Sequence, residues 1–155
     1  MTKEIVIYTD GACTGNPGAG GYGAVLIYNG HRKEISGGYK LTTNNRMEMM
    51  AAIAALQSLK EKCTVKLHSD SKYLVDAVTK GWAKKWQANG WKRNKKENAK
   101  NPDLWQTMLD LCQQHQVEFI WVKGHAGIPE NEQCDRLAVA AAKGLNLPPD
   151  EGYEC

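Results

Sequence analysis

The chain has 155 residues and a formal net charge of +3, which fits one domain built around a single hydrophobic core. Hydrophobic residues make up 42% of the sequence and charged residues 24%, so a disordered chain, a collagen-like fibre and a disulfide-rich miniprotein are excluded. No apolar run approaches the roughly 20 residues that span a bilayer, and the first residues lack the apolar core of a signal peptide. We therefore expect a cytoplasmic protein with no membrane partner.

The spacing of the cysteines supports the same location. They are odd in number and widely separated, without a C-x-x-C pair or histidines at the spacing of a zinc site. Neither a disulfide framework nor bound zinc is expected, and reduced thiols fit best. The five cysteines are Cys13, Cys63, Cys112, Cys134 and Cys155.

Positive charge is concentrated in residues 80–100. Eight basic residues and Glu97 give this segment a charge of +7, which leaves −4 for the rest of the chain. Such segregation calls for a physical cause. The basic residues are Lys80, Lys84, Lys85, Lys92, Arg93, Lys95, Lys96 and Lys100.

The first half of the chain predicts a meander followed by a helix. Residues 5–8 are apolar on both faces, as in a central strand of a sheet. A glycine-rich turn over residues 15–21 leads into two further strands, at 22–28 and 34–41, so the first three strands are antiparallel. From Asn45 the hydrophobic period becomes helical, and methionine and alanine predict a largely buried helix.

The second half predicts strands that alternate with helices. Its elements are a strand at 65–69, a helix capped by Ser71, a helix from Asn101-Pro102, a strand at 117–122 and a helix over 130–143. The tail over 145–155 is expected to be frayed and flexible. With a further helix between the helix at Ser71 and the helix at Asn101, the predicted order is β-β-β-α-β-α-α-α-β-α. Residues 1–144 thus form one α/β domain, with a mixed five-stranded sheet, three antiparallel strands and then parallel strands, flanked by helices.

Two predicted strands end in an aspartate, Asp10 and Asp70. If these strands are parallel neighbours, both carboxylates emerge at the carboxyl edge of the sheet, where α/β folds bind ligands. Taken alone, each aspartate fits an ordinary position better, because Asp-Gly is a common turn pair and Asp70-Ser71 suits a helix cap.

Two further acids lie on helices that are otherwise apolar. Glu48 is in the first turn of the methionine-rich helix, and Asp135 is near the start of the last helix. The alternatives are an acid favoured by the helix dipole for Glu48 and a surface charge for Asp135. Carboxylates that converge need a cation between them, and oxygen ligands select Mg²⁺ or Mn²⁺. Two such ions support phosphoryl transfer without a protein nucleophile.

Five segments in order resemble the motifs of bacterial type 1 ribonuclease H (RNase HI), and together they extend over most of the chain. Five ordered motifs at compatible spacing are far more specific than any one alone. The segments are YTDGACTGNPG at 8–18, TNNRME at 43–48, SDSKY at 69–73, WVKGH at 121–125 and NEQCD at 131–135.

The resemblance implies a ribonuclease H-like fold and a metal-dependent endonuclease. Such an enzyme hydrolyses the RNA strand of an RNA/DNA hybrid, leaves 5′-phosphate and 3′-hydroxyl ends, and serves in RNA primer replacement and R-loop removal. Asp10, Glu48, Asp70 and Asp135 match the family's ligands for two Mg²⁺ ions, for which Mn²⁺ is an alternative. His125 matches a loop histidine that assists water activation or product release, although a glycine-flanked histidine is more often an ordinary loop residue.

The resemblance also implies where the substrate binds. Asn16, Thr43, Asn44 and Asn45 match contacts to sugar hydroxyls, bases and DNA phosphate. The basic segment at 80–100 matches a handle that grips the DNA strand, through lysine and arginine charges and aromatic faces. An alternative is a solvated helical segment in which Trp86 and Trp105 form a small core. The handle residues are Trp82, Lys84, Lys85, Trp86, Trp91, Lys92 and Arg93.

Other functions fit less well. Residues 18–23 satisfy G-x-G-x-x-G, but they lead into a strand, whereas a dinucleotide-binding motif opens a helix. A transposase or integrase core places its glutamate after both aspartates, whereas Glu48 lies between Asp10 and Asp70. A silent nucleic-acid-binding module would not need the four carboxylates. We expect a monomer, and Lys72 is given no role.

Overall fold

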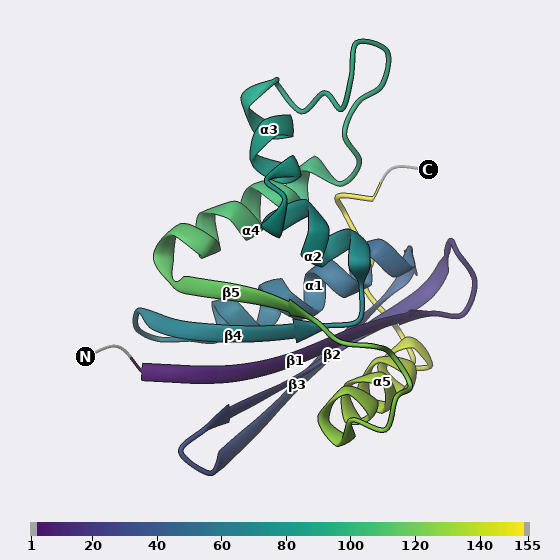
Figure 1. The fold of residues 1–155 in the computed structure, drawn as a ribbon. Helices are drawn as coiled ribbons and strands as arrows, with labels where there is room; N and C mark the ends of the chain where they lie inside the picture. Colours follow the sequence, from purple (N-terminus) through teal and green to yellow (C-terminus); the bar gives the residue numbers. More distant parts are fainter. Residues whose placement is uncertain (1–2, 154–155) are drawn as a thin grey trace.

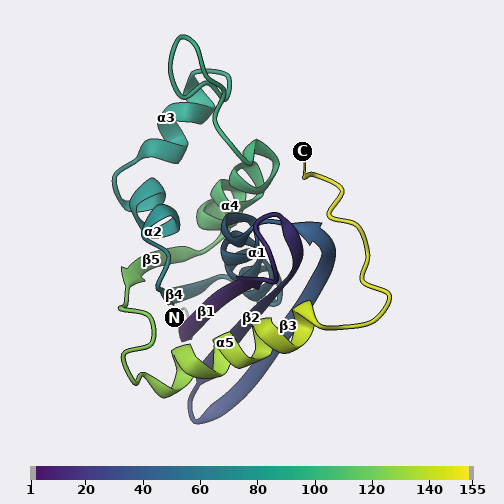
Figure 2. The same ribbon diagram turned by 90° about the vertical axis from the view of Figure 1, so that its right-hand side faces the viewer.

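The computed structural model describes residues 3–153, which fold around one mixed sheet of strand order β3-β2-β1-β4-β5. Helix α5 covers one face of the sheet, and α1 and α4 lie on the other (Figures 1 and 2). The predicted element order and sheet class are confirmed. The elements are β1 (Lys3–Cys13), β2 (Gly18–Tyr28), β3 (His31–Thr42), α1 (Asn44–Gln57), β4 (Cys63–Ser69), α2 (Lys72–Thr79), α3 (Trp82–Ala88), α4 (Pro102–Gln114), β5 (Gln116–Trp121) and α5 (Pro129–Ala142).

Strand β1 is central and sets the position of the predicted site. It pairs antiparallel with β2 and parallel with β4, with Thr9 opposite Ser69. Its buried side chains, such as Ile7, pack with Val65 and Leu67 of β4. Because the two strands run in the same direction and in this register, the residues that follow them emerge together at one edge.

The turn predicted over residues 15–21 is shorter in the structure. Residues 15–17 form the bend, but β2 already begins at Gly18, and α5 packs directly against its glycines. A Cβ atom at Gly21 or Gly23 would collide with the α5 backbone at Ala138 and Cys134. Glycine here permits close packing of helix on strand.

Of the two predicted helix caps, Ser71 is confirmed and Asn101 is wrong, and Thr43 is a cap that was not predicted. Ser71 Oγ accepts from the Leu74 N–H at 3.1 Å, and Thr43 Oγ1 accepts from the Arg46 N–H at 3.3 Å, one residue earlier than the predicted helix start. Asn101 precedes α4 as predicted, but its backbone is left-handed and its side chain makes no cap. Its Oδ1 accepts from Arg46 Nη1 instead.

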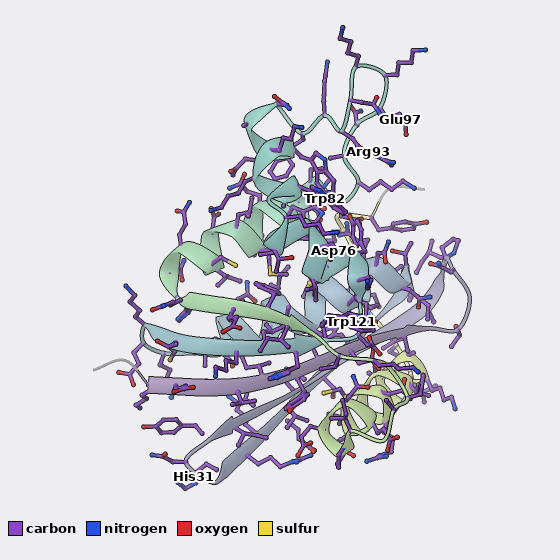
Figure 3. The ribbon with its side chains drawn as sticks, in the orientation of Figure 1. His31, Asp76, Trp82, Arg93, Glu97 and Trp121 are labelled. Atoms are coloured by element: carbon purple, nitrogen blue, oxygen red, sulfur yellow. The ribbon has the colours of Figure 1, made fainter. Side chains whose placement is uncertain are left out.

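The basic segment projects from the body as α3 and the loop that follows it (Figure 1). At its base, Trp105 is fully buried, and Trp86 lies edge-on to it at 6.2 Å between ring centroids. Trp91 also packs against the core. The small-core alternative therefore describes Trp86 and Trp105, because these rings cover each other. Figure 3 shows Trp82, Arg93 and Glu97 on the projection, away from the sheet.

The C-terminal tail differs from the frayed segment that the sequence predicted. The Lys40 N–H donates to Pro148 O at 2.9 Å, and Asp150 pairs with Arg46 at 2.7 Å. Ion pairing with a buried guanidinium holds residues 148–150 against the body, which hydropathy alone does not predict. None of the described helices is long and apolar enough to cross a membrane.

Candidate active site

Three carboxylates converge at the carboxyl edge of the sheet. Asp10 lies on β1, Asp70 directly follows β4, and Glu48 is in the second turn of α1. Each offers an oxygen, and these oxygens lie within 4.8 Å of one another. The predicted convergence is present, but two details of the prediction were wrong: β1 continues past Asp10 to Cys13, because it pairs with β2 as far as Gly20, and Glu48 lies one turn later in α1 than expected.

Two glycines make this convergence possible. A Cβ atom at Gly11 would lie 2.5 Å from the Glu48 amide nitrogen, so a larger residue would push α1 away from β1. The Gly11 N–H also donates to Asp10 Oδ1 at 2.9 Å. At Gly124 a Cβ atom would lie 2.7 Å from Asp70 Oδ2. Both positions require the absence of a side chain.

Burial and like charge raise the pKa values of the cluster. Burial raises the pKa of Asp10 to about 7; the charges of Asp70 and Asp135 act in the same direction, whereas hydrogen bonds with Glu48 and the Gly11 N–H oppose it. Burial, followed by the charges of Asp10 and Asp70, raises the pKa of Glu48 well above its usual range. Glu48 Oε2 is buried without a hydrogen-bond partner among the described residues. Asp10 and Glu48 therefore bind protons more readily than free carboxylates do, and a bound cation would oppose this.

The carboxylates line an open cavity of about 330 Å³. Asp135, half-buried on α5, lies on its wall but outside the group of three converging oxygens. His125 is also on the wall, exposed, with a φ of 55° in the loop between β5 and α5. The remaining lining residues are Gly11, Asn44, Asn45 and Ser71.

The four predicted polar contacts lie beside the carboxylates. Asn44 and Asn45 are exposed at the cavity, and Asn16 Oδ1 accepts from the Asn44 N–H at 3.2 Å. Asn16, Thr43 and Asn45 also line a second cavity, of about 760 Å³. The first turn of α1 thus forms the wall between the two cavities.

The handle residues form a separate surface. Residues 80–97 line neither cavity, whereas the end of the basic segment, Asn98, Ala99 and Lys100, lines the larger one. Trp82 is 38% exposed, with Lys80 Nζ 5.3 Å from its ring centroid. Trp86 and Trp91 are half-buried, so their faces are less available to a ligand than that of Trp82. All eight basic residues of segment 80–100 are exposed, among them the predicted contacts Lys84, Lys85, Lys92 and Arg93.

The sequence profile of the RNase H family matches residues 2–143 of the chain. The chain belongs to the RNase H family. Two relatives are a Ribonuclease H from Rippkaea orientalis, 73% identical over 152 residues (98% of this chain and 93% of the relative), and a Ribonuclease HI from Synechocystis, 65% identical over 152 residues (97% and 95%).

Solved structures agree with this family assignment. LC9-RNase H1, a type 1 RNase H with the type 2 active-site motif, is 34% identical and superposes with a TM-score of 0.84, covering 95% of this chain and 75% of that one. LC11-RNase H1 in complex with RNA/DNA hybrid is 24% identical, with a TM-score of 0.69 and coverage of 89% and 96%. The second likeness shows the RNase H fold alone.

Two residues close to the two cavities, Arg46 and Trp121, were given no role from the sequence. Arg46 is 2% exposed and pairs with Asp103 and Asp150; an arginine on a methionine-rich helix face was the available signal. Trp121 is 44% exposed, and its indole N–H donates to Asp70 O at 3.2 Å, which supports the Asp70 backbone (Figure 3). Nothing in the sequence pattern distinguished Trp121 from a strand-end aromatic residue.

Proposed function

We propose that this member of the RNase H family hydrolyses the RNA strand of RNA/DNA hybrids in the cavity lined by Asp10, Glu48 and Asp70, leaving 5′-phosphate and 3′-hydroxyl ends. The observation that carries the proposal is the convergence of three carboxylate oxygens within 4.8 Å, one of the carboxylates having a buried oxygen without a partner among the described residues. A nucleic-acid-binding module without chemistry has no use for such mutual repulsion.

The donor set fits Mg²⁺, with Mn²⁺ as an alternative. All its atoms are carboxylate oxygens, which are hard ligands, and no cysteine or histidine of the described residues belongs to the group. Asp10, Glu48 and Asp70 would hold two ions, with Asp135 across the cavity as a further ligand. When bound, such ions favour attack by water on a phosphodiester and stabilise the leaving oxygen.

The chain's own residues would select and place the substrate. The amide side chains of Asn44 and Asn45 line the carboxylate cavity, and Asn16 lies behind them on the larger cavity, so these amides can donate to and accept from a 2′-hydroxyl of the cut strand. Thr43 lies next to them as a contact to the phosphate of the uncut strand. The exposed cations of the handle would bind further phosphates of the DNA strand.

His125 would move protons or assist product release. Its side chain is exposed on the cavity wall, so it can approach a phosphate bound beside the carboxylates. Residues in such roles contribute about 10²- to 10⁴-fold to rate. We expect His125→Ala to retain measurable activity and near-normal hybrid binding. A complete loss of activity together with lost metal binding would make His125 a ligand.

The decisive experiment compares labelled substrates with and without metal. We expect cleavage of the RNA strand of an RNA/DNA hybrid with Mg²⁺, none with EDTA, and none of duplex DNA, duplex RNA or single-stranded RNA. Asp70→Asn is the control, because it should remain folded and inactive. Cleavage of duplex DNA would favour a transposase-like activity, and binding without cleavage would favour a silent module.

The cellular setting follows from the same proposal. An enzyme with this specificity would act in the cytoplasm, as a monomer, on RNA primers and R-loops. Among the described residues, the thiols of Cys13, Cys63, Cys112 and Cys134 are all free, which suits a reducing compartment.

A further inference from the structure

One carboxylate of the C-terminal tail contacts both ends of the segment 43–45. Thr42 Oγ1 donates to Asp150 Oδ2 at 2.7 Å, and Arg46 Nε donates to the same oxygen at 2.7 Å. Arg46 Nη2 donates to Asp150 Oδ1 at 3.0 Å. These contacts join parts of the chain that are 104 and 108 residues apart. Asp150 therefore spans the junction between β3 and α1.

Both partners of Asp150 are fixed by burial. Thr42 is fully buried, Arg46 is 2% exposed, and the Asp150 side chain is 8% exposed. Arg46 also donates to Asp103 through both terminal nitrogens and to Asn101 Oδ1. Because a charged hydrogen bond shielded from water is short and directional, Asp150 fixes residues 42 and 46 relative to each other.

Few side-chain contacts hold the residues between these two anchors. Their backbone starts helix α1, where Thr43 O accepts from the Met47 N–H at 3.1 Å. Asn44 and Asn45 are exposed, and the side-chain hydrogen bonds described for segment 43–45 are the Thr43 cap and the bond from the Asn44 N–H to Asn16 Oδ1. Residues 151–153 continue past Asp150 along the larger cavity, which Asn16 and Thr43 also line. The tail thus reaches the same wall that presents the amide side chains.

We propose that Asp150 is a positioning residue for the hybrid. By holding Thr42 and Arg46 together, it keeps Thr43, Asn44 and Asn45 in the orientation from which they contact the substrate. The inference rests on the proposed function, since it assumes that these residues bind the hybrid. Asp150 itself does not line the carboxylate cavity and takes no part in the chemistry.

Asp103 provides a matched control. It pairs with the same guanidinium, at 2.7 and 3.0 Å, and so contributes to the same buried cluster. It makes no described contact with Thr42, so it holds only one end of the segment. A purely structural role for Asp150 predicts that Asp150→Asn and Asp103→Asn differ only in how much they lower thermal stability.

The test measures KM, kcat and melting temperature with the full chain, an RNA/DNA hybrid and Mg²⁺. We expect Asp150→Asn to raise KM roughly 3- to 10-fold, the factor associated with one net hydrogen bond, with kcat within about 2-fold of the unmodified protein. Asp103→Asn should keep KM within about 2-fold even where its melting temperature falls. Exposed Glu151→Gln controls for the loss of one tail charge.

Thr42→Val gives an independent measurement, because it removes the Asp150 contact on the β3 side and keeps the Arg46 ion pair. It should also raise KM, and it should add little to Asp150→Asn in the double variant. If Asp150→Asn unfolds at the assay temperature, Thr42→Val decides alone. An unchanged KM in Thr42→Val, or equal KM changes in Asp150→Asn and Asp103→Asn, would overturn the positioning role. Failure of the unmodified protein to cleave the hybrid would overturn the proposed function instead.

Discussion

Helix α1 carries two charged side chains, two residues apart, with opposite surroundings. Glu48 points into a cluster of like charges and has a buried oxygen with no partner among the described residues. Arg46 donates to two carboxylates and an amide oxygen, in a cluster of opposite charges. Among the described residues, no cation balances the carboxylates around Glu48. The charge of Arg46, in contrast, is balanced by Asp103 and Asp150 of the same chain.

The difference separates binding from stability. Buried like charges oppose folding unless a cation is bound, so the folded state keeps the Glu48 cluster despite its cost. A buried ion pair stabilises the fold only while both partners are present, and loss of one partner leaves an uncompensated charge. Neutralising a member of each cluster should therefore have opposite effects on stability.

The largest expected effect is on activity, from Asp10→Asn. This change removes a proposed metal ligand and one of the repelling charges, so Mg²⁺-dependent cleavage should be abolished while metal-free thermal stability stays equal or rises. Initial cleavage rates and thermal unfolding with EDTA measure the two quantities. Substantial residual activity, or a large loss of stability without metal, would remove Asp10 from the cluster.

Arg46→Met should have the largest effect on stability. The change preserves much of the side-chain volume but leaves Asp150 buried without its cation, so unfolding free energy should fall by about 3–5 kcal/mol. Urea denaturation measures the loss, and adding Asp150→Asn to the variant should recover part of it. A loss below about 1 kcal/mol would mean that the Arg46 cluster contributes no more to the free energy of unfolding than a surface ion pair does.

The sequence predicts the like-charge cluster better than the ion-pair cluster for a physical reason. Strand direction predicts that Asp10 and Asp70 share one edge if β1 and β4 are neighbours, and the ordered motifs of the family resemblance add Glu48 to them. The contact between Arg46 and Asp150 joins segments 104 residues apart and leaves no periodic trace.

The errors elsewhere have the same origin. The glycines of β2 were predicted to form a turn because a close helix contact from α5 cannot be inferred from the strand itself. The packing of Trp86 on Trp105 was one of two alternatives that the sequence left open, and the docking of the tail depends on a buried partner. Local sequence patterns therefore predict the elements and the strand-end carboxylates, whereas contacts between distant segments required the structure.

The two clusters should also respond oppositely to pH. The pKa of Asp10 is raised to about 7 from 3.8, so its folded form binds protons more readily than its unfolded form, and its contribution to stability is lost as pH rises from about 4 through 7. Burial alone would raise the pKa of Asp103, but hydrogen bonds and charge from Arg46 outweigh it and lower the pKa. That contribution is present above about pH 4 and is lost in acid.

Metal-free stability should therefore be greatest near pH 4–5. Melting temperatures with EDTA from pH 3 to 8 measure it, and we expect a decline of a few degrees between pH 5 and 7. Asp10→Asn should flatten that decline, and Mg²⁺ should reverse it, because deprotonated carboxylates bind the ion. A stability that rises steadily from pH 5 to 7 without metal would contradict the raised pKa values.

The smallest effect on stability is expected from the handle, whose charges belong to neither kind of cluster. They are exposed, so their removal should change unfolding free energy by no more than about 0.5 kcal/mol. Removing these cations should instead weaken binding of the hybrid, because cations that contact phosphates release the counterions bound there and so favour association. The test variant replaces four cations with alanine: Lys84, Lys85, Lys92 and Arg93.

In this quadruple variant, the slope of log affinity against log salt should become shallower by roughly 0.9 for each phosphate that the handle no longer neutralises. KM should rise more than kcat falls, because these cations bind the hybrid before the transition state is reached. Trp86→Ala is the control: its ring packs on Trp105, so it should lower the melting temperature and leave the salt slope unchanged. If the quadruple variant keeps its KM and salt slope, the handle does not bind the hybrid, and the chain's positive charge is segregated there for another partner.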